Sequence, residues 1–135
     1  MDTNRRTDYA TLVLRLSLGM MFVAHGLLKI TVFSLPGTVA FFVSVGLPGW
    51  LAYPVAFGEI IGGALLLGGI YTSYVVVGLL PILIGAAVVH SGNGWVFSNA
   101  NGGWEYTAFL IAASVALALL SDGAFAWKPR RRTQN

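Results

Sequence analysis

Residues 10–30 read ATLVLRLSLGMMFVAHGLLKI, a mostly apolar stretch whose only ionisable residues are Arg15, His25 and Lys29. A transmembrane helix needs about 20 predominantly apolar residues, so this stretch predicts a helix that crosses a membrane. It is too long for the apolar region of a secretory signal peptide, and no small-residue cleavage site follows it. We therefore expect it to persist as the first membrane span.

The composition of the whole chain points to the same class of protein. The 135 residues are 56% hydrophobic and 10% charged, and the mean hydropathy is +0.76. A small soluble domain could not bury so many apolar side chains, and a disordered chain would need low hydrophobicity and high charge. The chain has no cysteine, which excludes disulfides, thiolate metal sites, thiol catalysis and covalent c-type haem attachment.

Three further stretches are long and apolar enough to be membrane spans. They cover residues 50–70, 72–91 and 103–120. The apolar piece at 38–45 is too short to span, and glycine and proline bound it on both sides, which predicts a half-inserted or surface helix. The expected fold is therefore all-α, an integral membrane antiparallel four-helix bundle with a short extra helix between helices 1 and 2.

Small residues predict where these helices touch, because helices in lipid associate through close packing. Gly58 and Gly62 lie four residues apart in the second span. Pro81 should bend the third span by removing a backbone hydrogen bond. Close contacts are also expected at Gly78 and Gly85 in the third span, and at Ala108, Ala112 and Ala116 in the fourth.

The distribution of charge predicts the orientation. Basic residues flank the spans at both ends of the chain, whereas the loops at 31–49 and 92–102 carry no charged residue. By the positive-inside rule both termini are cytoplasmic, in a multi-pass protein of the inner (plasma) membrane. No nucleic-acid partner is expected, because the basic tails flank apolar spans. Aromatic residues mark the two predicted interfaces, Trp50, Tyr53, Trp95, Trp104 and Tyr106 outside and Tyr9 and Trp127 inside.

Ionisable side chains inside the spans are costly in hydrocarbon and are functional candidates for that reason. Arg15, His25 and Lys29 share one face of the first helix. Glu59 falls near the predicted midplane, so we expect it to meet at least one of these three basic groups. The charges can instead fix the helix register, with Lys29 and Glu105 snorkelling to the interface.

Two other ionisable side chains lie near the ends of the predicted spans. Asp122 is expected to be a solvated helix end, and His90 is a weaker candidate than His25.

Several motifs in a fixed order resemble the DoxX family of small four-helix membrane proteins. They are the segment Leu14-Arg15-Leu16-Ser17-Leu18-Gly19 with Phe22, His25-Gly26 and Lys29, then Gly46-Leu47-Pro48, then Glu59, Gly62-Gly63, Leu66 and Gly68, then Gly102-Gly103 and Glu105. The resemblance covers almost the whole chain outside the tails. On this basis residues 10–122 form a DoxX-like domain, between an N-terminal tail at 1–9 and a basic cytoplasmic tail at 123–135.

The resemblance implies a subunit of a quinone-linked redox system or of an oxidative-stress complex. The candidate binding cluster is Arg15, His25, Lys29, Glu59 and Glu105, with Phe22 and Trp104 as pocket walls and no metal. A bound quinone is the expected cofactor, and the expected partners are lipid, a membrane or soluble redox protein, and a second copy of the chain. If catalytic, the chain would be a subunit of a quinone-dependent oxidoreductase.

Three other functions remain open from the sequence. The chain can be a non-catalytic membrane scaffold for a soluble partner, or a pathway for small solutes or protons through Glu59. A haem held by His25 and His90 is the third alternative.

Overall fold

A computed structural model describes residues 1–127 of the chain. The helices in this part are α1 (Thr3–Thr31), α2 (Leu35–Ser44), the 3-10 turn η1 (Gly49–Leu51), α3 (Ala52–Gly68), α4 (Thr72–His90), the 3-10 turn η2 (Ser91–Asn93) and α5 (Glu105–Leu119). The all-α class is confirmed, and α2 is the short extra helix predicted between the first two spans. The predicted basic tail from Lys128 onward lies outside the described residues.

Local capping explains where α1 begins and where α3 ends. The Asp2 side chain accepts a hydrogen bond from the Arg5 backbone N–H at 2.8 Å, which satisfies a free donor of the first turn and starts α1 before the apolar stretch. Gly69 follows α3 with a left-handed φ of +67°, a conformation that glycine adopts without steric penalty. A tight turn at residues 69–71 therefore joins α3 to α4.

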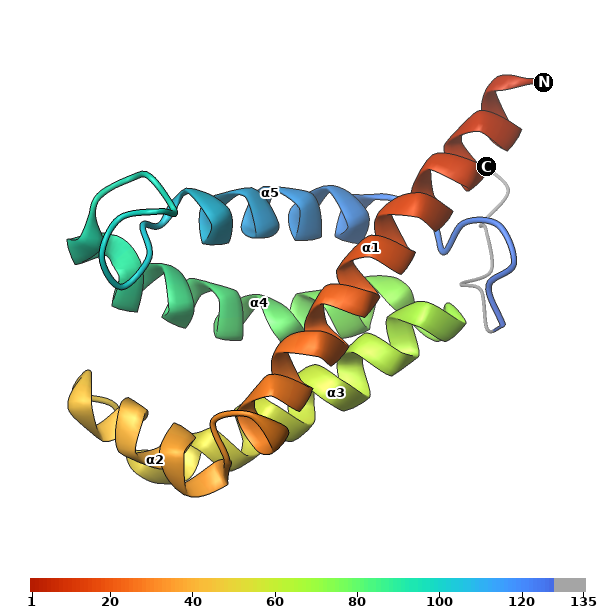
Figure 1. The fold of residues 1–135 in the computed structure, drawn as a ribbon. Coiled ribbons are helices and arrows are strands. Elements are labelled where there is room, and N and C mark those ends of the chain that lie inside the picture. Colours follow the sequence, from red (N-terminus) through yellow and green to blue (C-terminus); the bar gives the residue numbers. More distant parts are fainter. Residues whose placement is uncertain (128–135) are drawn as a thin grey trace.

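The helices form two antiparallel pairs, in which α1 packs mainly on α3 and α4 mainly on α5. Figure 1 shows the pairs close together toward the chain termini and apart toward α2 and the loop between α4 and α5. We call the end with α2 and residues 91–104 the loop end, and the end with residues 120–127 the terminal end.

Close backbone contact holds α1 against α3. A Cβ atom built on Gly63 would lie 2.7 Å from the Gly19 carbonyl oxygen, and one built on Gly26 would lie 2.7 Å from the Ala56 carbonyl oxygen. Real Cβ atoms do not approach this closely, so only glycine fits at these two crossings. The predicted contact at Gly62 is also confirmed, since a Cβ there would meet the Leu79 side chain of α4 at 2.8 Å.

Four of the small residues predicted at helix contacts do not lie at one. A Cβ built on Gly78 or Gly85 would have no neighbour within 4 Å, and Ala112 and Ala116 are exposed. The prediction for these positions is wrong because α5 buries a different face, made of Thr107, Leu110, Ser114 and Leu117. A small residue therefore does not by itself mark a helix contact, because the helix can pack through larger side chains on another face.

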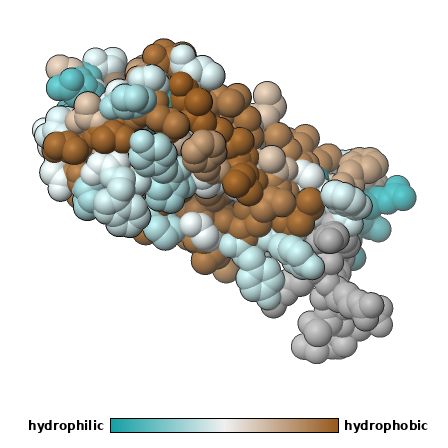
Figure 2. All heavy atoms as spheres, turned by 90° about the horizontal axis from the view of Figure 1, so that it is seen from below, coloured by the Kyte–Doolittle hydropathy of each residue, from teal (hydrophilic) through white to brown (hydrophobic). Residues whose placement is uncertain are grey.

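The outer surface is suited to lipid. Three helical segments, Thr3–Thr31, Gly49–Gly68 and Thr72–Asn93, are long and apolar enough to cross a membrane, and α5 is a shorter apolar helix of 15 residues. Large apolar side chains such as Met20, Ile61 and Phe109 are exposed on these helices. Figure 2 shows apolar residues along the middle of one face, with hydrophilic atoms gathered toward the ends.

The α1–α3 crossing predicts a sharp difference between two glycine substitutions. Gly63→Ala should lower the free energy of unfolding in detergent by about 1–3 kcal/mol, because its methyl group would press on the backbone of α1. The matched variant Gly78→Ala should not destabilise, since its methyl group would enter open space. Equal thermal stability of the two variants would contradict this packing.

Candidate functional site

An ion pair joins α1 to α3 inside the bundle. Lys29 Nζ lies 2.7 Å from Glu59 Oε2, and the Glu59 side chain is 6% exposed. Side chains on a helix tilt toward its N-terminus, so on antiparallel helices Lys29 and Glu59 lean toward one another. Glu59 therefore meets one of the three predicted basic groups, and Lys29 reaches inward to it.

His25 lies one helical turn before Lys29 and borders the same pair. Its Nδ1 donates a hydrogen bond to the Met21 carbonyl oxygen at 2.8 Å, so in the neutral ring Nε2 carries no proton and can accept one. No partner for Nε2 is present among the described residues. The His25 ring stacks on Tyr106 of α5 at a centroid distance of 6.1 Å.

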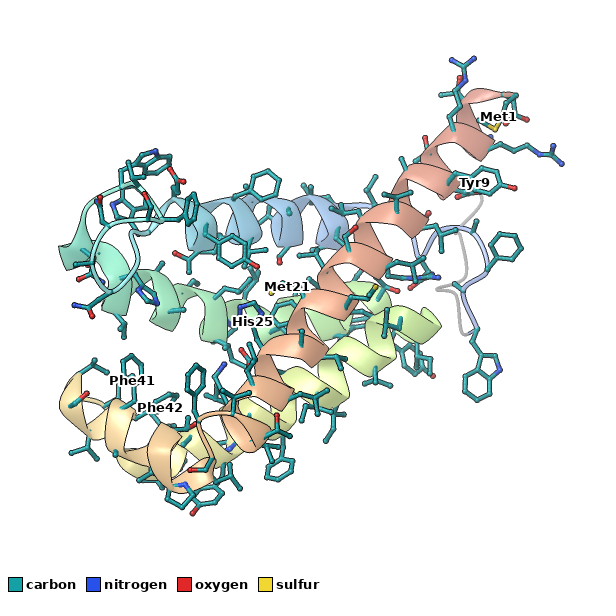
Figure 3. The ribbon with its side chains drawn as sticks, viewed as in Figure 1. Met1, Tyr9, Met21, His25, Phe41 and Phe42 are labelled. Carbon is teal, nitrogen blue, oxygen red and sulfur yellow. The ribbon has the colours of Figure 1, made fainter. Side chains whose placement is uncertain are left out.

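The short helix α2 is tied to the same place. The Thr38 hydroxyl is placed at 3.0 Å to donate to the Lys29 carbonyl oxygen and at 2.9 Å to donate to that of Ser34. These contacts hold α2 beside the end of α1 that carries Lys29. Figure 3 shows Phe41 and Phe42 pointing from α2 toward α4, and His25 entering the same space from α1.

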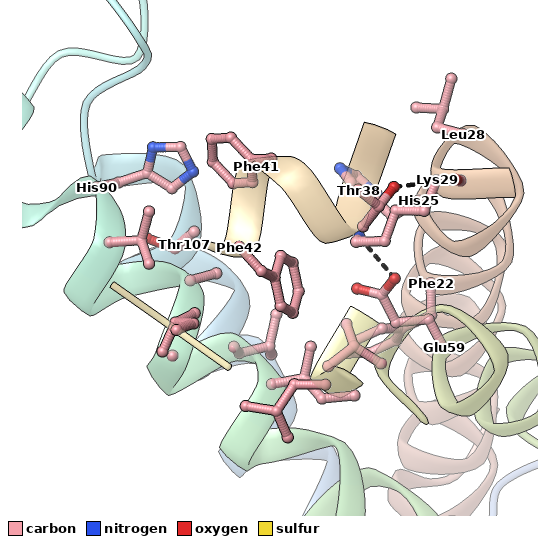
Figure 4. Close-up of a pocket in the computed structure, with 18 of the residues that line it drawn as sticks. Phe22, His25, Leu28, Lys29, Thr38, Phe41, Phe42, Glu59, His90 and Thr107 are labelled. Atoms are coloured by element: carbon pink, nitrogen blue, oxygen red, sulfur yellow. Dashed lines mark hydrogen bonds and ion pairs between the residues drawn. The ribbon is translucent and has the colours of Figure 1, made fainter. Parts of the chain in front are cut away.

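A cavity of about 990 Å³ lies between α1, α2 and α3 on one side and α4 and α5 on the other. Its polar side chains include the Lys29–Glu59 pair and His25, shown in Figure 4. Most of the remaining lining is apolar, including Phe22, Leu28, Phe41, Phe42, Leu51, Val55, Ile82, Leu83, Val89 and Leu110. A charged pair on the wall of an apolar cavity gives a ligand one place for polar contacts and a large apolar surface.

The structure places four of the predicted site residues together. Phe22, His25, Lys29 and Glu59 all line the cavity. Arg15 does not, because it leans toward the terminal end, where its guanidinium donates to the Asp122 and Ala124 carbonyl oxygens.

The terminal end also corrects the expectation for Asp122. This residue is 3% exposed rather than solvated, and its carboxylate accepts a hydrogen bond from the Thr72 backbone N–H at 3.0 Å. The chain after α5 turns back across the bundle, where the Ala124 N–H donates to the Asp8 carbonyl oxygen and the Trp127 N–H to that of Gly68. Arg15 and Asp122 thus fasten residues 120–127 to the helices.

Glu105 and Trp104 lie at the loop end and do not line the cavity. The Trp104 ring packs edge-on against Trp95 at a centroid distance of 4.5 Å. Glu105 lines a separate groove beside the cavity. The structure therefore brings neither residue to the Lys29–Glu59 pair.

Several residues that line the cavity were not predicted from the sequence as site residues. They are Tyr106, Thr107, Phe41 and Phe42. His90, a weaker candidate than His25 in the sequence, also lines the cavity. The signal for Thr107 was its spacing of seven from Ser114, which places two polar residues on one face of an apolar helix. Among the described residues no group of three His, Cys, Asp or Glu side chains could hold a metal ion.

Comparison with known proteins identifies the family of this chain. The sequence profile of the DoxX family matches residues 10–92. The chain belongs to the DoxX family. It is 36% identical over 126 residues to the Bacillus subtilis (strain 168) protein named "Putative oxidoreductase CatD", and the match covers 93% of this chain and 90% of that protein. No solved structure gives a significant match.

The ion pair predicts non-additive effects of substitution. Lys29→Met should cost about 3–5 kcal/mol of unfolding free energy, because it leaves a buried carboxylate unpaired. Adding Glu59→Gln to Lys29→Met should recover part of this loss. Unfolding in detergent of both single variants and the double variant measures the coupling, and strictly additive losses would show that the pair does not form.

Proposed function

We propose that this DoxX-family protein is a membrane subunit of a quinone-linked oxidoreductase or oxidative-stress complex. The ligand bound in its cavity would be a lipid-soluble quinone. One observation carries the proposal, namely the Lys29–Glu59 pair with His25 on the wall of a large apolar cavity. The oxidoreductase name of the Bacillus subtilis relative supports the redox class.

The residues that line the cavity fit a quinone. Ligand pockets of roughly 300–1,000 Å³ bury most of a small ligand and orient it with few polar groups, and this cavity has about 990 Å³. Phe22, Phe41 and Phe42 offer aromatic walls for a flat ring. The apolar side chains of α2 and α4 offer a surface for a hydrocarbon tail.

Each polar group has a distinct part in binding. The Lys29 ammonium has three N–H donors, of which one reaches Glu59, so another can donate to a carbonyl oxygen of the ring. Neutral His25 can accept a proton at Nε2 from a hydroxyl group of the reduced ring, since Nδ1 already donates to Met21. Glu59 holds the ammonium in place from α3. When bound, a quinone supplies the capacity to take up and release electrons together with protons.

A purified-protein experiment tests the quinone directly. Lys29→Met should raise the Kd for a quinone by about 10- to 100-fold, as expected when a charged hydrogen-bond donor is lost. Lys29→Arg, which keeps the charge and the donors, should retain much of the affinity. Asp2→Asn changes an exposed carboxylate at the far end of α1 and should have no effect. Binding that is absent in the folded wild-type protein would favour a scaffold without a ligand, and binding that is unchanged in folded Lys29→Met would show that Lys29 does not hold the quinone.

We further propose a plasma-membrane location with both termini in the cytoplasm. The uncharged loops at 31–49 and 92–102 support this orientation, because loops rich in Lys and Arg stay inside. A topology reporter fused at Asn93 should therefore report the side opposite to one fused at the C-terminus. Reporters on the same side would refute the arrangement.

A further inference from the structure

A groove lies next to the cavity at the loop end. Residues of α1, α4, α5 and the loop between α4 and α5 line it, namely His25, His90, Trp95, Phe97, Gly102, Gly103, Glu105, Tyr106, Thr107 and Phe109. Glu105, the first residue of α5, is half-buried in this groove. The Trp95 and Trp104 rings pack together in the neighbouring loop.

The groove and the cavity share a wall. Four residues line both spaces, namely His25, His90, Tyr106 and Thr107. The stacked rings of His25 and Tyr106 lie within this wall.

A larger share of the groove's lining residues can form hydrogen bonds with water than of the cavity's. Five of its ten lining residues carry an ionisable or hydroxyl side chain, namely His25, His90, Glu105, Tyr106 and Thr107, against seven of the 25 residues that line the cavity. His90 is held toward the loop, where its Nδ1 is placed to donate to the Asn101 and Gly102 carbonyl oxygens. Water molecules in the groove would therefore find hydrogen-bond partners along its length, from Glu105 to the imidazole of His25.

We propose that this groove is an aqueous access route from the loop end to His25, with Glu105 at its mouth. Water and protons from that side of the membrane reach the His25 imidazole along it. Glu105 makes the route electrostatically favourable to cations. The route goes beyond the proposed quinone site, and it stands whether or not the ligand is a quinone.

The absence of cysteine in the chain makes single-cysteine labelling a clean test. His25→Cys and Thr107→Cys place a thiol in the shared wall, and two variants keep the test open if one of them misfolds. Ala24→Cys is the matched control, because Ala24 neighbours His25 on the exposed outer face of α1. Trp95→Cys in the exposed loop reports which side of the membrane the loop end faces.

Intact cells and inverted vesicles are treated with a membrane-impermeant methanethiosulfonate reagent. Cysteine at 25 or 107 should react from the same side as cysteine at 95, and cysteine at 24 should not react from either side. Reaction of 25 and 107 only with a lipid-soluble maleimide would overturn the proposal. Equal reaction at 24 and 25 would overturn it too, because water would then reach the outer face of α1 and the groove would not be the route.

The role of Glu105 is tested with reagents of opposite charge. At position 25, a cationic methanethiosulfonate should react several-fold faster than an anionic one, relative to the same ratio at position 95. Glu105→Gln should abolish this preference and leave access itself intact. An unchanged preference in Glu105→Gln would remove Glu105 from the mouth of the route. Quinone binding is measured separately, so failure of the route and failure of the proposed ligand are distinguishable.

Discussion

The close approach of α1 and α3 decides where the charges of this protein lie. Glycine at positions 19, 26 and 63 lets the two backbones touch, and the antiparallel arrangement makes Lys29 and Glu59 lean toward one another. The same tilt takes the Arg15 side chain away from Glu59 and toward the terminal end, where it donates to the Asp122 carbonyl oxygen. One packing constraint thus separates a cation that faces the cavity from a cation that fastens the terminal end.

The helix pair α4 and α5 forms the mainly apolar side of the cavity. Since α4 and α5 diverge from α1 and α3 at the loop end (Figure 1), side chains of α2 and α4 face one another across a cavity. In lipid such a space can hold an apolar ligand. The Coulombic attraction within an ion pair on its wall is stronger than in water, because the surroundings screen it less. The charged pair and the apolar cavity therefore make a site together that neither would make alone.

Much of this arrangement could be predicted from the sequence, and the rest depends on how the pairs pack. The lengths of the apolar stretches gave the helices, and the scarcity of charges required that Glu59 meet a basic group. The sequence could not show which group, because depth along a helix ignores the tilt that favours Lys29 over Arg15. Nor could it place Tyr106 and His90 at the cavity or Trp104 against Trp95, since those contacts depend on the angle between the two helix pairs and on the path of the loop.

Isotope-edited infrared difference spectroscopy of the Glu59 carboxylate tests the central claim most directly. The Glu59 band, identified by its loss in Glu59→Gln, should be that of an ionised carboxylate paired with a cation. Adding a quinone should shift this band in the wild-type protein and not in Lys29→Met, because the ligand would share the ammonium donor. A neutral carboxylic acid band, or a carboxylate band that bound quinone leaves unchanged, would contradict the account.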